Sequence, residues 1–199
     1  MVQTKKAKTG KKKFFPVNIP LTATKVELYG YAPQDFEGSM VKLDMTRTLK
    51  GKSLELKALV SVKGDVLEGE IVSAQLLPSA IRRMIRRGTD YIEDSFTVQC
   101  KDGIVRIKPF MITRKHVSRS IRHAIRELAK KHLEAHLKVR TTKEIFSEIM
   151  SNKIQKDISL KAKKIYPLAL CEIRMLEIER SAVLKTKEDR PVQPQKASA

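Results

Sequence analysis

The sequence has no tryptophan, and aromatic residues make up only 5% of its 199 positions. No stretch approaches the roughly 18 consecutive apolar residues that a membrane-spanning helix needs. The first residues are charged and no apolar segment follows them, so we expect no secretory signal. The shortage of Trp and Tyr also argues against a protein that rests on a lipid surface, where these residues form interfacial belts.

Cysteine and glycine are scarce as well. Cys100 and Cys171 are the only two cysteines, and neither has a second Cys or a His at the spacing of a metal site. We therefore expect two reduced thiols in the core and neither a disulfide nor a zinc site. The chain has 8 glycines, and no glycine-rich phosphate loop or dinucleotide-binding pattern occurs.

The four histidines all lie between residues 116 and 136. His132 and His136 are four residues apart, a spacing that places two zinc ligands on one face of a helix. The metalloprotease pattern requires a glutamate directly after the first histidine, and Leu133 stands there instead. We expect His132 to be partly buried and the other three to lie near phosphates or solvent. The sequence thus predicts no metal, no cofactor, no small-molecule substrate and no enzyme.

Positive charge is the property that the sequence has in excess. Lys and Arg number 41 against 22 Asp and Glu, which gives a formal net charge of +19. A fold with this excess repels itself until counterions or phosphates neutralise it, so we expect a polyanionic partner. Nucleic acid fits the pattern better than a membrane does. The hydrophobic share of 41% is still sufficient for a packed core.

Three segments concentrate this charge. Residues 1–13 carry six lysines and no acid, and we expect a disordered arm that orders on RNA. Residues 78–88 carry four arginines, and residues 106–140 carry 11 basic and two acidic residues, a local charge of +9. Arginine binds phosphate through two parallel hydrogen bonds, which suits recognition of folded RNA by its shape and backbone. The predicted RNA-binding residues are Lys5, Lys6, Lys8, Lys11, Lys12, Lys13, Arg82, Arg83, Arg86, Arg87, Arg114, Lys115, Arg119, Arg122, Arg126 and Lys130.

Aromatic stacking on bases stays an open alternative, because no recognisable RNA-binding motif supports it. The aromatic candidates are Phe14, Phe15, Tyr29, Tyr31 and Phe110.

Hydrophobic periodicity predicts strands first and helices later. Lys63-Gly64-Asp65 and Lys101-Asp102-Gly103 are turn signals, so each is expected to close a hairpin. Thr142 is a candidate helix cap. The expected elements, in chain order, are strands over 40–47, 53–62 and 66–77, a helix over 78–88, strands over 90–99 and 104–112, helices over 117–135, 143–150 and 154–162, and a strand over 168–178.

This order predicts an α+β fold, with a barrel-like, mainly antiparallel sheet, two or three packed helices and a basic N-terminal tail. The expected organisation is a basic disordered tail or arm over 1–13, a single globular RNA-binding domain over 14–184, and a flexible C-terminal tail over 185–199. The last segment is rich in Lys, Glu, Gln, Pro, Ser and Ala, which cannot pack a core.

Several short stretches, in this order, resemble a known family: the small-subunit ribosomal proteins that archaea and eukaryotes share and bacteria lack. The family is called S-three-Ae in the older naming and eS-one in the uniform one. The resemblance runs from about residue 14 to 180. Its matching stretches are the lysine-rich start, Leu43-Asp44-Met45-Thr46-Arg47, Met84-Ile85-Arg86-Arg87, Lys101-Asp102-Gly103, Val139-Arg140-Thr141-Thr142, Ile154-Gln155-Lys156-Asp157-Ile158 and Ile165-Tyr166-Pro167-Leu168.

The resemblance implies a structural protein on the platform of the small subunit, near the mRNA exit region and the 3′ end of the small-subunit rRNA. Its partners would be that rRNA and neighbouring ribosomal proteins, in the cytoplasm. Eukaryotic members are longer at both ends, so this chain is expected to be of the archaeal type. A free-standing RNA-binding factor or chaperone is the alternative, and an enzyme acting on RNA is a third reading.

Overall fold

The computed structural model describes residues 11–22, 26–49, 52–64 and 66–179. The chain divides into two compact units, Met1–Ala80 and Ile81–Ala199. Each unit has its own apolar core, and the expectation of one domain over 14–184 stays a prediction.

The first unit is an open five-stranded sheet. Its strands run in the order β2-β1-β5-β4-β3, with β1 and β5 parallel and the other neighbours antiparallel. No pairing among the described residues joins β2 to β3, so the sheet does not close into a barrel. The elements are β1 (Lys13–Asn18), β2 (Val26–Gly30), the 3-10 helix η1 (Pro33–Phe36), β3 (Met40–Asp44), β4 (Leu54–Lys63) and β5 (Val66–Leu76).

Alternation in β4 builds the core of this unit, as the sequence predicted. Leu54, Leu56, Ala58 and Val60 are all 1% exposed or less. The expected hairpin from β4 to β5 is confirmed, and Gly64 in its turn has a φ of 64°, which glycine adopts without strain.

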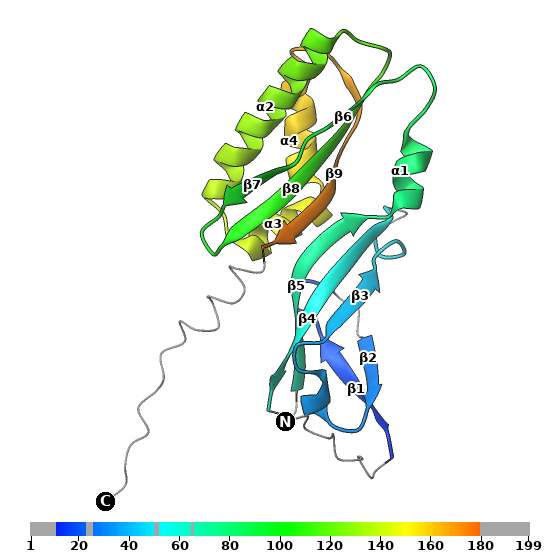
Figure 1. Ribbon diagram of the computed structural model, residues 1–199, viewed down its shortest axis with the longest axis vertical. Coiled ribbons are helices and arrows are strands. Elements are labelled where there is room, and N and C mark those ends of the chain that lie inside the picture. Colours follow the sequence, from blue (N-terminus) through cyan, green and yellow to red (C-terminus); the bar gives the residue numbers. More distant parts are fainter. Residues whose placement is uncertain (1–10, 23–25, 50–51, 65, 180–199) are drawn as a thin grey trace, which may run out of the picture. The chain divides into compact units, whose positions relative to one another are not determined.

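The second unit packs three helices on a four-stranded antiparallel sheet. Strands β6 and β7 both pair with β8, and β8 pairs with β9. Helices α2 to α4 lie together on one face of these strands (Figure 1), with α2 against α4 and α4 against β9. The elements are β6 (Tyr91–Glu93), β7 (Phe96–Gln99), β8 (Ile104–Thr113), α2 (Arg119–Lys138), α3 (Thr142–Met150), α4 (Lys153–Ala162) and β9 (Leu168–Ile178).

The predicted α+β class, mainly antiparallel pairing and packed helices are confirmed. Two strands were missed, β1 and β2, and Lys13 at the end of the expected tail begins β1.

The helix expected over 78–88 is shorter than predicted. Helix α1 spans Pro78–Met84, and a turn follows in which Gly88 has a φ of 81°. The buried side of this helix ends before Ile85: Ile81 is buried, whereas Ile85 is 40% exposed. Another helical turn would therefore bury little further apolar surface. Arg86 and Arg87 therefore lie in a loop and not on the helix.

Candidate nucleic-acid interface

Most of the predicted RNA-binding residues lie in the second unit, and most of these are exposed. Arg122 and Lys130 are half-buried. The exposed ones are Arg82, Arg83, Arg86, Arg87, Arg114, Lys115, Arg119 and Arg126. In the first unit, Lys11, Lys12 and Lys13 are exposed, whereas Lys5, Lys6 and Lys8 fall outside the described residues.

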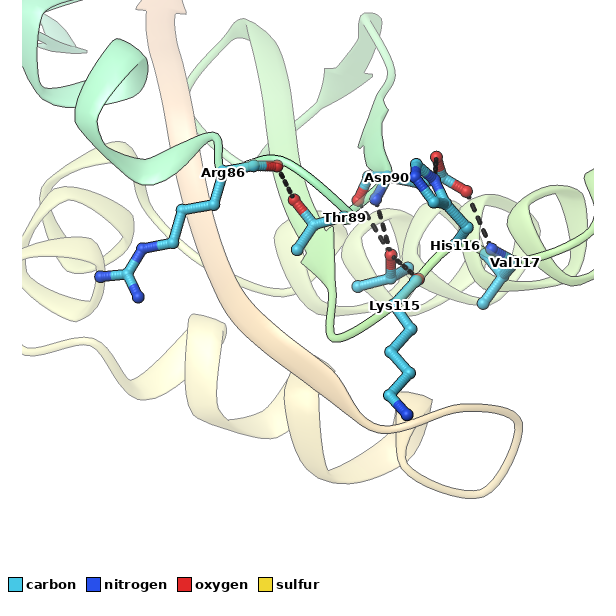
Figure 2. Close-up of polar contacts among 7 residues, drawn as sticks. Arg86, Thr89, Asp90, Lys115, His116 and Val117 are labelled. Carbon is cyan, nitrogen blue, oxygen red and sulfur yellow. Dashed lines mark hydrogen bonds and ion pairs between the residues drawn. The ribbon is translucent and has the colours of Figure 1, made fainter.

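Two loops that carry basic residues, 85–90 and 114–118, are joined by hydrogen bonds (Figure 2). We call them the paired loops. Buried Thr113, at the end of β8, donates its backbone N–H to the Asp90 carbonyl at 2.9 Å, and its Oγ1 accepts the Asp90 N–H at 3.0 Å. The Asp90 carboxylate in turn bonds His116 Nδ1 at 2.8 Å and accepts the Val117 N–H at 2.9 Å.

Each loop also has an internal bond that shapes it. The Thr89 hydroxyl donates to the Arg86 carbonyl at 2.7 Å, and Thr113 Oγ1 lies 2.8 Å from the Lys115 carbonyl. The Arg86 and Lys115 side chains both extend away from the Asp90 bonds (Figure 2). The hydrogen bonds therefore link two segments that carry basic side chains, although these segments lie more than 20 residues apart in the sequence.

The groups around Asp90 stabilise the ionised form of its carboxyl. The Val117 N–H and the His116 ring lower the pKa of its carboxyl below the ordinary value of 3.8, and the positive charge of Arg122 acts in the same direction. Hydrogen bonds to the charged form favour ionisation, so Asp90 is a carboxylate at neutral pH. An acid within a basic surface thus serves to position the loops.

The basic side chains of α2 follow one side of the helix. Arg119, Arg122 and Arg126 are separated by three and four residues, which places them in one row. The buried stripe next to them is Ile125, Ala129, Leu133 and Leu137. Ala135, where the predicted helix ends, is exposed and lies outside this stripe.

Arg122 has a different environment from its neighbours. Its Nε is buried without a hydrogen-bond partner among the described residues, and its charge acts on Asp90. Arg119 and Arg126 are exposed. Of the row on α2, these two arginines are therefore the more accessible ones.

Two arginines that add to the charge of 106–140 are engaged within the protein. Arg140 pairs with the buried Glu148 of α3, and His136 Nε2 lies 3.6 Å from the same carboxylate. Arg106 pairs with Glu179 at 3.1 Å. His136 is thus half-buried beside this carboxylate and less exposed than the sequence predicted.

The histidines and cysteines form no metal site in the part of the chain described. No group of three or more His, Cys, Asp or Glu side chains is placed there to hold a metal ion. His132 and His136 stack with ring centroids 5.9 Å apart, and burial lowers the pKa of His132. Cys100 and Cys171 are buried free thiols, and burial raises their pKa values to about 11 and about 12.

The aromatic candidates divide into buried and exposed residues. Phe110 is fully buried in the second unit, so it cannot stack on a base. Phe14, Tyr29 and Tyr31 are 66%, 56% and 41% exposed in the first unit. Among the described residues, no helix is long and apolar enough to cross a membrane.

Comparison with known proteins gives consistent matches. The model of the ribosomal S3Ae family matches residues 2–182. A protein of Nanoarchaeum equitans named small ribosomal subunit protein eS1 is 27% identical over 188 residues, which cover 90% of this chain and 95% of the relative. The protein of the same name from Methanothermobacter thermautotrophicus is 30% identical over 144 residues, 71% of each chain. Both relatives are archaeal, as the sequence predicted.

Proposed function

Because the chain belongs to the ribosomal S3Ae family, we propose that it is a structural constituent of the small ribosomal subunit that binds small-subunit rRNA. The family is one of ribosomal structural proteins, and the chain is not an enzyme. The match over 2–182 is the observation that carries this proposal, since it spans both compact units.

The RNA-binding surface of the second unit consists of the paired loops and the exposed arginines of α2. Arg86, Arg87, Arg114 and Lys115 bind phosphates from the loops, and Arg119 and Arg126 extend the contact along the helix. Such contacts position a protein on folded RNA without reading bases. The tie through Asp90 reduces the entropy that is lost when the loops meet the RNA.

The proposal extends to the N-terminal lysines and to the place in the subunit. Residues 1–13 supply positive charge that orders on RNA through counterion release. The family resemblance implies the platform of the small subunit, near the mRNA exit region, with neighbouring ribosomal proteins as further partners. The working location is then the cytoplasmic ribosome.

Charge reversal on α2 tests the RNA contact. Arg119→Glu combined with Arg126→Glu should weaken binding to a small-subunit rRNA transcript by about 10-fold or more, because each lost phosphate contact is worth roughly 1–3 kcal/mol. A plot of the logarithm of the binding constant against the logarithm of the salt concentration has a negative slope. The magnitude of this slope should decrease by about two, roughly one for each phosphate contact removed. Filter binding at several salt concentrations measures both.

Lys156→Glu with Lys163→Glu is the matched control, since it changes the net charge equally at exposed positions of α4 and of the residue after it. The control should weaken binding less and leave the salt slope nearly unchanged. Equal losses for the two pairs would mean that net charge alone governs binding, and α2 would be removed from the interface.

A further inference from the structure

The hairpin of β1 and β2 exposes three aromatic rings on one face. Phe14 lies directly opposite Tyr29 in the antiparallel register, and their ring centroids are 4.9 Å apart. Tyr31 comes directly after the end of β2, and its ring lies near that of Tyr29, because the Lys12 ammonium is within 5.5 Å of both ring centres. We call these three side chains the aromatic face. Exposed aromatic rings stabilise a fold far less than buried ones do. A cluster of three exposed rings is therefore typical of a binding surface.

Positive charge accompanies these rings. The ammonium of Lys12 lies 5.5 Å from the centre of the Tyr29 ring and 5.3 Å from that of Tyr31. Lys11 and Lys13 flank it and are exposed. Glu27 is the one acidic residue in β1 and β2, opposite Pro16 and beyond the Phe14–Tyr29 pair from the lysines.

The opposite face of the hairpin holds it firmly. Phe15 packs on Phe36 of η1 with ring centroids 6.0 Å apart. Gly30 lets the Phe36 ring come so close that an added Cβ would lie 2.4 Å from it. β1 also pairs with the central strand β5, so the aromatic face is presented on a supported strand pair.

We propose that the aromatic face binds an unpaired segment of RNA by stacking its bases on Phe14, Tyr29 and Tyr31. Bases stack on aromatic rings whatever their sequence, and lysines beside the rings neutralise the phosphates between them. The base replaces the Lys12 ammonium over the ring, and the ammonium then pairs with a phosphate. This inference rests on the proposed RNA-binding function and adds the class of RNA, single-stranded and stacked, and a site in the first unit.

The test uses the full chain and two oligonucleotides of about 12 residues, oligouridine and its abasic analogue, which keeps the phosphates and lacks the bases. The wild type should bind oligouridine more tightly than the abasic strand. Phe14→Ala, Tyr29→Ala and Tyr31→Ala together should weaken oligouridine binding by about 10-fold or more and remove this preference. Met40→Ala, at a residue of the same unit that is 50% exposed, is the matched control and should change nothing.

Fluorescence provides a second readout that a merely structural effect would not imitate. The chain has no Trp and 4 Tyr, and two of these four tyrosines belong to the aromatic face. Oligouridine should quench this emission in the wild type. Tyr29→Phe with Tyr31→Phe should keep the affinity, because the rings remain, and lose the quenching.

The outcomes separate the two proposals. If the alanine variant binds oligouridine as tightly as the wild type, the aromatic face has another occupant, such as a protein, and the inference is wrong. The rRNA-binding function would survive that result as long as the α2 pair of substitutions weakens rRNA binding. If the wild type binds neither oligouridine nor rRNA, both proposals fail.

Discussion

The carboxylate of Asp90 ties its own loop, 85–90, to the loop 114–118, since it contacts both His116 and Val117. Nothing in the sequence marks Asp90, because these partners are 26 and 27 residues away and the acid stands within a basic region. A search for clustered positive charge finds Arg86 and Lys115 and passes over the acid that brings their loops together. The basic residues of the paired loops were therefore predictable, and the bonds that join the loops were not.

Removing the charge of Asp90 should destabilise the protein in a pH-dependent way. The pKa of Asp90 is lower in the folded protein than its ordinary value of 3.8. Its contribution to stability is therefore present above about pH 3.8 and is lost as the pH falls through the lower folded pKa. Asp90→Asn should lower the free energy of unfolding at pH 7, and the difference from the wild type should shrink below about pH 3.8. Urea unfolding from pH 7 to pH 3 measures this difference, and one that stays constant over the range would contradict the account.

The ion pair between Arg140 and Glu148 is a second residue-scale feature that charge counting misses. Arg140→Met keeps most of the side-chain stem and removes the guanidinium from the buried carboxylate, which then has His136 Nε2 at 3.6 Å. Because an unpaired buried charge is costly, we expect a loss of about 1–3 kcal/mol in the free energy of unfolding. Lys131→Met, at an exposed position of α2, is the control and should stay within about 0.5 kcal/mol of the wild type. Similar values for the two variants in urea would show that the pair does not support the fold.

At the scale of elements, β9 shows where sequence patterns succeed and fail. Its bounds, Leu168–Ile178, were predicted correctly, but its buried residues do not follow a regular alternation. The pairing with β8 slips at two points, so that Ala169 and Arg174 have no residue opposite them in β8, and the set of inward-facing positions shifts by one after each slip. Leu168, Cys171, Ile173 and Leu176 are buried as a result. A strict period of two cannot anticipate bulges, because they depend on the partner strand.

The N-cap residue of helix α3 lies one position before the residue that the sequence predicted. Thr141, not Thr142, is the cap, and its side chain accepts the Glu144 N–H while the Glu144 carboxylate accepts the Thr141 N–H. The Thr-x-x-Glu spacing of this reciprocal pair was present in the sequence.

The cap makes a prediction for the stability of α3. Thr141→Ala should lower the free energy of unfolding by about 1 kcal/mol, because the side chain no longer satisfies a helix N–H. Thr142→Ala keeps the reciprocal pair and should have a smaller effect. Chemical denaturation of both variants gives the comparison. A larger loss of unfolding free energy from Thr142→Ala than from Thr141→Ala would contradict the assignment of Thr141 as the cap.

For the whole molecule, the charge of +19 and the two compact units lead to one account. In our proposals, the second unit contacts phosphates through the paired loops and α2, and the first unit stacks bases on the aromatic face beside its lysines. The α+β class could be read from the order of elements. The division into two units could not, since no linker or change of composition marks it near residue 80.

Membership of the small subunit is the central claim. Its most direct test is sedimentation of a lysate of the native cells through a high-salt sucrose gradient, with the protein followed by antibody. We predict that the protein migrates with the small subunit and remains there at salt concentrations that remove loosely bound factors. Protein found only at the top of the gradient would contradict the account and favour a free-standing RNA-binding factor.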